Sequence, residues 1–437
     1  MSKVIIVGGG LSGLAAAYWA SEAGLEVYVV EAAHNLGGCH RTVTLEGRFF
    51  DLGDEYFDAQ PSTLLELCSQ VGLEPQPFPK LQRVVRLRGQ DWVLPSGFNP
   101  ATGYGLHQLA TLPFGPGVKW RLAAERFVPA ATVKDESLDA FVRRRLGLEI
   151  WEVLEPFLSA ILGGPAEEAA TPEAFAALLE LERQGGLMVA SRRLKTEGRW
   201  SLAGGMGSLV QALGTHLLSK ARIFTGQEAL AITRDKGRWQ VHTPGGRLEA
   251  EAVVLALPAP RAARVFRPSA PQMTALLNQF PYRHSAKAFL LFRHTGPEAG
   301  PVEYYWAKTE SYVGSSLRLS QLEPELTLAL VQFIGDVAHT ADAELSRLAQ
   351  QDLSRYLQTQ VRPLAAWVFR QPYSRPQFTP GHTRRLEALE QALVHAPGLF
   401  LTGSYLAGPG LARQIAYSHK ITQHLLNFLA LSALQAD

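Results

Sequence analysis

Cysteine and charge are both scarce in this chain. Only two of its 437 residues are cysteine, Cys39 and Cys68, which excludes a disulfide framework and a cysteine-based zinc site and favours a reducing cytoplasm. Charged residues make up 19% of the chain, less than the roughly 25% of an ordinary globular protein. The formal net charge of +2 excludes a wholly basic surface for nucleic acid.

Long hydrophobic runs are absent as well. The most apolar early stretch, residues 4–20, includes four glycines and follows a single basic residue, Lys3. These features argue against a signal peptide and a membrane anchor. We expect a cytoplasmic protein that contacts the inner face of the membrane at most peripherally.

A strand, a glycine-rich turn, a helix and a second strand are predicted near the start of the chain. Residues 4–7 and 27–30 are short β-branched runs typical of buried parallel strands. An alanine-rich helix is expected over residues 14–23, ending at Gly24. Three glycines precede it with G-x-G-x-x-G spacing: Gly8, Gly10 and Gly13. This order is the dinucleotide-binding fingerprint.

Each glycine has its own role in that motif. Gly8 allows the tight turn, Gly10 lets the backbone approach a pyrophosphate, and Gly13 lets the helix pack closely on the strand. The helix N-terminus, with Leu11 and Ser12, offers free N–H groups to the phosphates. The alternative for the whole motif is a glycine-rich structural turn.

Glu31 closes the second strand about twenty residues beyond the glycines. Its carboxylate is suited to accept hydrogen bonds from the hydroxyls of an adenosine ribose. The same negative charge would repel a 2′-phosphate, so NADP is disfavoured.

A second glycine motif follows, because residues 36–42 read LGGCHRT. They resemble the G-G-R-x-x-T motif of the flavoprotein family that includes amine oxidases, phytoene desaturases and protoporphyrinogen oxidases. Cys39 stands where that family has arginine, and Arg41 is expected to replace the arginine at a phosphate. Since no base is paired with Cys39 in the sequence, the alternative is a small buried thiol. The matching positions are Gly37, Gly38 and Thr42.

Residues 49–57, FFDLGDEYF, resemble the D-x-G segment of the same family. That segment lies close to the flavin, which makes Gly53 a predicted cofactor-binding residue. Asp54 and Glu55 are candidate functional carboxylates. The alternative is that both cap the turn or stay solvated.

A strand, a turn and a helix return near the end of the chain. A strand is predicted over residues 399–402 and a helix over 411–429, with a Gly-Pro-Gly turn between them. The N-terminus of this helix is suited to the electron-rich edge of a reduced flavin. The alternative is a simple loop before an amphipathic helix. This interpretation adds four cofactor-binding residues: Gly403, Ser404, Gly410 and Leu411.

Taken along its length, the chain resembles the protoporphyrinogen oxidase branch of the flavin amine oxidase superfamily. The resemblance implies FAD as cofactor and removal of hydride from a porphyrinogen, with the flavin reoxidised by oxygen or another acceptor. It rests on these segments: VIIVGGGLSGLAAAY, DESLDAFVRRRLG, EPFLSAILGG, WSLAGGMGSL, VVLALPAPRAA, Trp367, Gln371-Pro372-Tyr373, Pro380-Gly381-His382 and GLFLTGSYLAGPGL.

Other positions bear on substrate and catalysis. Lys287 stands where amine oxidases carry a lysine near flavin N5, so the resemblance makes it a candidate catalytic residue; the alternative is a strand-end lysine reaching solvent. Ser404 replaces an acid of the amine oxidase branch, and Ser418 replaces a glycine of the porphyrinogen oxidase branch. Three arginines are candidates for the carboxylates of a tetrapyrrole, or else exposed strand charges: Arg83, Arg86 and Arg88.

Three hypotheses follow. The first is an FAD oxidase of a porphyrinogen-like tetrapyrrole. The second is an FAD-dependent amine oxidase or isoprenoid desaturase, and the third is a flavin-binding protein that has lost catalysis. In every case we expect a small apolar substrate or none, no nucleic acid and no metal.

Further elements are predicted from periodicity. A strand pair is expected over residues 81–95, a strand over 223–232 and a helix over 342–362. A helix is expected to begin near Leu138. Its run of arginines at 143–145 is either a solvated stripe or a contact for anionic lipid or an acidic substrate.

The predicted fold class is α/β: a Rossmann-type FAD-binding domain with an inserted α+β substrate domain and a helical subdomain. At roughly 150 residues per domain, 437 residues suggest about three units. Three separate stretches are expected to build the FAD-binding domain: residues 1–80, 200–265 and 385–437. Between them lie a mostly helical insertion over residues 81–199 and the substrate domain over residues 266–384.

Overall fold

The structure is a computed structural model that describes most of the chain in two compact units. Unit 1 comprises residues 1–78, 197–280 and 383–437, and unit 2 comprises residues 79–196 and 281–382. The described residues are 2–79, 81–100, 102–130, 135–195, 198–267, 269–294, 302–306, 314–335, 337 and 339–434, without the side chains of residues 173, 314, 315 and 334.

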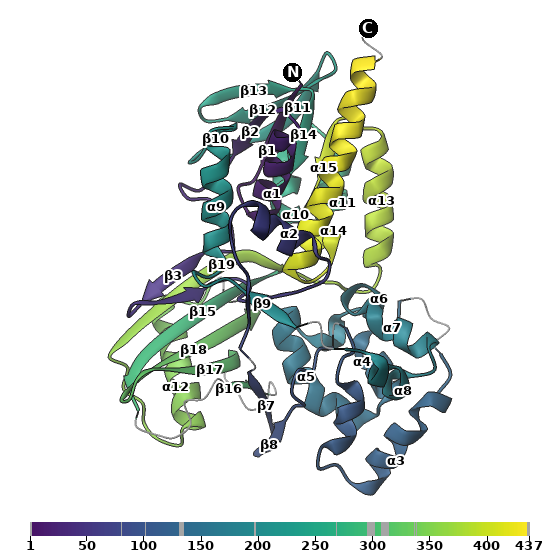
Figure 1. The fold of residues 1–437 in the computed structure, drawn as a ribbon, viewed down its shortest axis with the longest axis vertical. Helices are drawn as coiled ribbons and strands as arrows, with labels where there is room; N and C mark the ends of the chain where they lie inside the picture. Colours follow the sequence, from purple (N-terminus) through teal and green to yellow (C-terminus); the bar gives the residue numbers. More distant parts are fainter. Residues whose placement is uncertain are drawn as a thin grey trace. The chain divides into compact units, whose positions relative to one another are not determined.

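Unit 1 is built on a five-stranded sheet in which every pairing is parallel (Figure 1). Its order is β10-β2-β1-β14-β20, so strands from all three segments of unit 1 lie side by side. The fold is therefore a mixed α/β fold, as predicted. The strands are β1 (Lys3–Val7), β2 (Glu26–Val30), β10 (Ala221–Phe224), β14 (Ala252–Leu255) and β20 (Leu399–Leu401).

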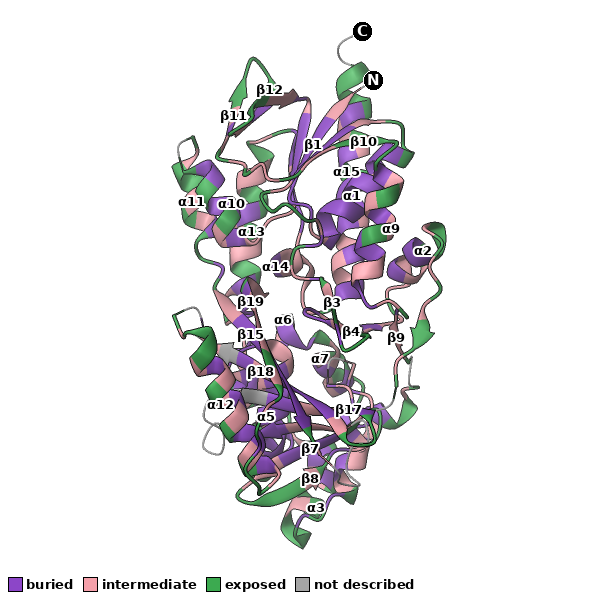
Figure 2. Ribbon diagram, turned by 90° about the vertical axis from the view of Figure 1, so that its left-hand side faces the viewer, coloured by how far each residue is buried: buried purple, intermediate pink, exposed green. Residues whose placement is uncertain are grey.

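One helix of unit 1, α1 (Leu11–Glu22), is buried on nearly every side and is drawn almost wholly as buried in Figure 2. Its alanines let α15 (Leu411–Leu434) and α9 (Gly207–Leu217) pack closely against it in one hydrophobic core. The other helices are α2 (Thr63–Gln70), α10 (Ala259–Phe266), α11 (Pro271–Leu277), α13 (His382–Val394) and α14 (Ser404–Ala407).

Unit 1 also carries three small antiparallel sheets. The predicted strand over residues 223–232 is wrong, because β10 ends at Phe224 and the next strand starts only at Ala231, after a turn in which Gly226 has a φ of 67°. The strands of these sheets are β3 (Thr42–Leu45) with β4 (Arg48–Asp51); β5 (Phe57–Asp58), β9 (Arg199–Ser201) and β6 (Gln76–Pro77); and β11 (Ala231–Asp235), β12 (Arg238–Thr243) and β13 (Gly246–Ala250).

Unit 2 is built on a seven-stranded sheet of order β19-β15-β18-β17-β16-β7-β8. The pairing of β16 with β7 is parallel and the others are antiparallel. The predicted strand pair at 81–95 is thus confirmed, with its turn at Arg88 and Gly89. The strands are β7 (Gln82–Leu87), β8 (Gln90–Val93), β15 (Tyr282–Arg293), β16 (Val302–Trp306), β17 (Gly314–Glu323), β18 (Leu326–Gly335) and β19 (Ala365–Pro376).

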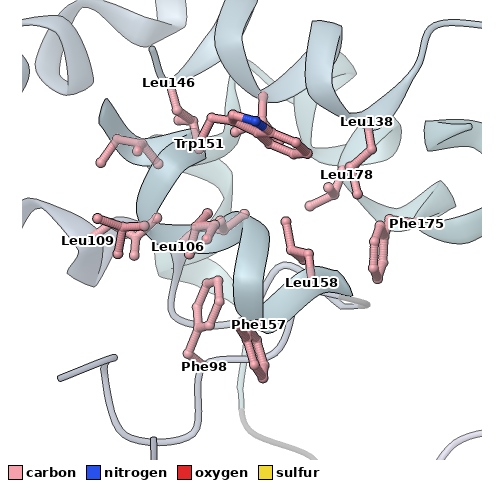
Figure 3. Packing of buried hydrophobic residues seen from close by; sticks show 14 of the residues in the cluster. Phe98, Leu106, Leu109, Leu138, Leu146, Trp151, Phe157, Leu158, Phe175 and Leu178 are labelled. Carbon is pink, nitrogen blue, oxygen red and sulfur yellow. The ribbon is translucent and has the colours of Figure 1, made fainter. Parts of the chain in front are cut away.

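Helices of unit 2 pack into two hydrophobic cores. One face of the sheet packs against α12 (Asp342–Tyr356), which ends before the predicted residue 362. The other core lies among the helices that follow β8, where leucine and aromatic side chains interdigitate (Figure 3). The remaining helices are α3 (Pro116–Ala124), α4 (Leu138–Arg145), α5 (Leu148–Leu162), α6 (Thr171–Ala174), α7 (Ala176–Arg183) and α8 (Leu187–Ala190), with 3₁₀ turns η1 (Leu106–Thr111), η2 (Glu125–Phe127), η3 (Ala166–Glu168) and η4 (Ser191–Arg193).

The arginine run at 143–145 is exposed to solvent only at Arg143. Arg145 is only 2% exposed and pairs with Glu125, which is wholly buried. Glu182 accepts a hydrogen bond from Arg144 at 2.9 Å and forms an ion pair with Arg145 at 3.6 Å. Because a buried guanidinium needs carboxylate partners, two of the arginines of this run hold the helical core together.

The two units group the predicted segments differently from the sequence prediction. Because β7 and β8 complete the sheet of β15–β19, residues 79–196 and 281–382 form one unit rather than two separate lobes. Residues 266–280 belong to unit 1. The roles assigned to the five segments stay predictions.

Within the described part of the chain, no helix has the length and apolar character that crossing a bilayer requires.

Candidate functional site

The predicted nucleotide site lies at one edge of the unit 1 sheet, where the parallel strands end. The N–H of Gly8 donates to Val30 O at 2.8 Å, and the N–H of Glu31 donates to Phe224 O at 2.8 Å. On the other side of β1, the N–H of Thr402 donates to Leu255 O at 2.9 Å. In open α/β sheets, ligands bind at this carboxyl edge.

The first glycine motif has backbone conformations and contacts that a side chain would disrupt. Gly8 has a φ of 108°, and a Cβ there would lie 2.5 Å from Ala256 O. A Cβ on Gly13 would lie 1.9 Å from the carbonyl oxygen of Gly8. Gly13 is therefore required for α1 to start directly above β1, as the sequence predicted.

The second glycine motif lies beside the first. Gly10 forms a parallel bridge with Gly37, and the N–H of Gly37 donates to Gly9 O at 2.8 Å. A Cβ on Gly38 would lie 3.3 Å from the Cα of Gly10. The two glycine turns, 27 residues apart at Gly10 and Gly37, thus form a surface of bare backbone.

Glu31 joins these turns to β2. One oxygen of its carboxylate accepts the N–H of Gly9 at 2.7 Å, and the other accepts the N–H of Ala33 at 2.8 Å. Each carboxylate oxygen has a second lone pair, so Glu31 retains acceptor capacity for ribose hydroxyls.

The residues present fit a dinucleotide. α1 begins at Leu11 with Gly10 as its N-cap, and no side chain caps its first turn. Leu11 and Ser12 are buried beside the loop. An uncapped helix N-terminus beside side-chain-free backbone is the cradle that a pyrophosphate requires.

Thr42 forms structural hydrogen bonds that the sequence did not predict. Its hydroxyl donates to Asp51, and it accepts the N–H of Gly207 at 2.8 Å. Asp51 also accepts the N–H of Met206 at 2.8 Å. Thr42 and Asp51 together therefore cap the N-terminus of α9.

Two further predicted residues flank the second motif. Arg41 is exposed, and its carbonyl accepts the N–H of Leu52 at 2.8 Å. Gly53 is buried, and a Cβ there would lie 2.7 Å from the carbonyl oxygen of Cys39. The glycine is required by this close approach.

Cys39 contacts a histidine that the sequence analysis missed. The Cys39 Sγ lies 3.4 Å from His40 Nδ1, and His40 Nε2 lies 3.3 Å from Asp54 Oδ2. Cys39 is partly exposed rather than buried. No spacing pattern marks this cluster, because Asp54 reaches His40 only through the β3–β4 hairpin.

The C-terminal motif packs against the first one. Trp19 and His419, each eight residues beyond the start of α1 and of α15, have ring centroids 4.5 Å apart. The two helices therefore start at the same end (Figure 1). The turns before α15 contain Gly403 with a φ of 143° and Gly410 with a φ of 99°, and the predicted Ser404 and Leu411 each follow one of these glycines.

Ser418 is wholly buried and hydrogen-bonded. Its hydroxyl lies 2.8 Å from Thr402 Oγ1 and donates to Gln414 O at 3.0 Å. A serine in place of glycine thus links α15 to the end of β20.

Lys287 lies in the middle of β15, between Gln332 of β18 and Phe369 of β19. Its side chain is 6% exposed. The alternative of a strand-end lysine reaching solvent is therefore wrong. Because its neighbours Ala286 and Ala288 face the core with α12, Lys287 lies on the opposite face of the sheet.

The three candidate substrate arginines already have protein partners. Arg83 is buried, donates to Phe98 O at 3.1 Å and lies over the Phe157 ring. Arg86 binds Asp91 through two hydrogen bonds of 2.7 Å, and Asp91 thereby raises the pKa of Arg86. Their neighbour Arg88 is exposed and pairs with a glutamate at 2.8 Å.

Comparison with known proteins gives one family. The sequence model described as flavin containing amine oxidoreductase matches residues 11–418. Coproporphyrinogen III oxidase of Bacillus subtilis (strain 168) is 23% identical, with 98% of each chain covered. Protoporphyrinogen oxidase of Bos taurus is 27% identical, over 90% of this chain and 91% of the bovine one.

The fold has solved counterparts. The crystal structure of an Exiguobacterium sp. 255-15 protein, assigned by name as a protoporphyrinogen oxidase, superposes with a TM-score of 0.84 at 24% identity. The superposition covers 97% of this chain and 98% of the other.

Proposed function

The chain belongs to the flavin containing amine oxidoreductase family, and from that premise we propose that it is an FAD-dependent oxidase of a porphyrinogen-like tetrapyrrole. One observation carries the substrate class. Relatives named for coproporphyrinogen III and protoporphyrinogen oxidation match nearly the whole chain, through both units. The family itself implies a flavin cofactor.

FAD is the flavin that the glycine turns suit. We propose that the turn shaped by Gly8 and Gly13 receives its pyrophosphate at Gly10 and that Glu31 accepts hydrogen bonds from its ribose. When bound, FAD supplies the acceptor for the hydride. The bare backbone at Gly10 and Gly38 supports this assignment, because a side chain at either position would stand in the cradle.

The protein's own contribution is to bind and orient the substrate and to exclude water. The resemblance to amine oxidases makes Lys287 a candidate for a cation near the flavin; in unit 2 it is buried on the face of the sheet opposite α12. Arg83, Arg86 and Arg88 remain candidates for substrate carboxylates. Of these, Arg88 is the most exposed, with 73% of its side chain accessible.

A porphyrinogen assay tests the proposal. The purified protein should be yellow and should release FAD on denaturation. It should then oxidise protoporphyrinogen or coproporphyrinogen in air faster than a flavin-depleted sample of the same protein, measured by porphyrin fluorescence.

Three other outcomes would each change the proposal. Turnover of amines or isoprenoids without porphyrinogen turnover would replace the tetrapyrrole by another substrate class of the family. Tightly bound FAD without turnover of any of these would identify a flavin-binding protein without catalysis. A colourless protein that does not take up FAD would overturn the proposal.

We also propose a peripheral membrane contact at α3 and η2. Trp120 and Phe127 are 75% and 72% exposed there, beside the exposed basic residues Lys119, Arg121 and Arg126. Exposed aromatic and basic side chains together favour an anionic lipid surface. Co-sedimentation with anionic vesicles, lost in a Trp120→Ser/Phe127→Ser variant, would support the contact, and equal sedimentation of the variant would refute it.

A further inference from the structure

Cys39, His40 and Asp54 form a row of interacting side chains beside the second glycine turn. The imidazole of His40 lies between the other two groups, with Nδ1 3.4 Å from the Cys39 Sγ and Nε2 3.3 Å from the Asp54 Oδ2. A thiol, an imidazole and a carboxylate in this order are the arrangement that activates a nucleophilic sulfur.

The three residues differ in burial. His40 is 5% exposed, while Cys39 and Asp54 are both partly exposed. Cys39 is therefore more accessible than the imidazole beside it, which is shielded. The preceding Gly37 and Gly38 add no side chains that could cover it.

Charge favours a protonated imidazole at this position. Burial alone would lower the pKa of His40, but the interactions with Cys39 and with the Asp54 carboxylate outweigh it and raise the pKa to about 10. An imidazolium 3.4 Å from sulfur stabilises the thiolate, which is the nucleophilic form of cysteine.

The second cysteine, Cys68, lies in an apolar environment, where burial rather than a charged partner shifts its pKa. Cys68, in α2, is wholly buried in the hydrophobic core of unit 1, and this burial raises the pKa of its thiol to about 12. Cys68 should therefore remain a protonated, inert thiol. The chain thus contains its own internal control.

We propose that Cys39 is a modification site, a thiolate paired with the His40 imidazolium that reacts with small electrophiles and with hydrogen peroxide. With iodoacetamide, the sulfur forms a bond to carbon and iodide leaves. With hydrogen peroxide, the sulfur bonds to one oxygen and the O–O bond breaks, giving a sulfenic acid and hydroxide, which takes up a proton to become water. The sulfur is oxidised by two electrons and the peroxide is reduced.

His40 and Asp54 are positioning residues in this proposal. His40 stabilises the thiolate directly, and Asp54 acts through His40 by keeping its ring charged and oriented. The proposal concerns the thiol alone and does not depend on the oxidase function.

Alkylation kinetics test the proposal on the protein as purified, with its flavin. The protein is treated with iodoacetamide at pH 6.5 and 8.5, and the Cys39 and Cys68 peptides are quantified by mass spectrometry. Cys39 should react at rates within about 3-fold of each other at the two pH values, whereas an ordinary thiol loses about 50-fold. Cys68 should stay unlabelled. A 50-fold loss for Cys39, or no labelling, would overturn the proposal.

Variants separate the roles of the neighbours. At pH 6.5, His40→Gln should slow labelling of Cys39 by about 10-fold or more, and Asp54→Asn should slow it less. Asp58→Asn, at a carboxylate four residues after Asp54 that pairs with Arg199, is the matched control and should leave the rate unchanged. Cys68→Ser should also leave it unchanged. Because the wild-type pH profile stands on its own, a His40 variant that fails to fold does not remove the test.

The peroxide reaction has a separate readout. After brief exposure to hydrogen peroxide, dimedone should label Cys39 as the sulfenic acid and leave Cys68 unlabelled. Reduction before dimedone should abolish the label. Labelling of Cys68 to the same extent, or none at Cys39, would contradict the assignment.

Discussion

The carboxylate of Glu31 accepts the backbone N–H of Gly9 at 2.7 Å, so an acidic side chain at the end of β2 holds the glycine turn that follows β1. The conformation of the glycine turn expected to bind phosphate therefore depends on Glu31, the residue expected to bind the ribose.

Replacing Glu31 should therefore weaken FAD binding. Glu31→Gln exchanges the carboxylate that accepts the Gly9 N–H for a neutral amide, and a charged hydrogen bond of this kind is worth about 1.5–3 kcal/mol. We expect FAD affinity to fall at least about 10-fold in fluorescence titration. Glu46→Gln, at an exposed turn of the same unit, should have no effect. Equal affinities for the two variants would show that Glu31 has no role in binding.

Gly13→Ala should disrupt the start of α1. The new Cβ would lie 1.9 Å from Gly8 O, so the helix must shift from β1. We expect a loss of stability of about 3 kcal/mol or more, or loss of the flavin. Gly117→Ala in α3, where a Cβ meets nothing within 4 Å, should change the free energy of unfolding by less than about 1 kcal/mol. Denaturant unfolding of both variants is the measurement, and similar midpoints would refute the packing argument.

Arg145→Met should cost about 3–5 kcal/mol, because it leaves the wholly buried Glu125 without its cation. Adding Glu125→Gln should recover some of the loss. Arg88→Met, which breaks an exposed pair with Glu152, should cost at most about 1 kcal/mol. Thermal unfolding distinguishes the pairs, and a small effect at Arg145 would mean that solvent reaches the helical core.

His40 should make stability depend on pH at the alkaline end. Its pKa is raised from 6.5 in the unfolded chain to about 10, so its contribution is full below pH 6.5 and is lost as pH rises through about 10. The difference in Tm between the wild type and His40→Gln should therefore be larger at pH 7 than at pH 10. A difference that grows toward pH 10 would show that the folded protein holds a neutral imidazole.

Lys287→Met should slow reoxidation of the reduced flavin by oxygen by about 10-fold, because the variant lacks a buried cation that can stabilise the negative charge formed as oxygen is reduced. Stopped-flow absorbance measures this step alone. Lys220→Met, at an exposed lysine paired with Glu22, serves as the control. An unchanged rate for Lys287→Met would leave Lys287 with a purely structural role.

The elements that the sequence predicts well are those with a local signal. β1, α1 and β2 follow from two β-branched runs separated by glycines. α4 begins at Leu138, as expected, and the structure shows that the hydroxyl of Ser137 caps it by accepting the N–H of Ala140 at 3.2 Å. Hydrophobic periodicity and capping act over a few residues, so they can be read without the fold.

The features that the sequence misses depend on distant partners. Arg145 has the same neighbours as an exposed helical arginine, and only the approach of Glu125 and Glu182 makes it a core residue. The pKa of His40 is likewise raised by Cys39 and by Asp54, and the β3–β4 hairpin brings Asp54 back to it. Such pairs are set by tertiary contact, which no periodicity records.

The parallel sheet of unit 1 has a consequence for synthesis. β14 pairs with β20, which lies about 150 residues later in the sequence, and α15 follows β20. During translation, β1, β2 and β14 are therefore synthesised well before β20, the strand that pairs with β14. The second segment of unit 2 is synthesised between β14 and β20. We expect the nascent protein to need protection from aggregation until α15 has emerged from the ribosome.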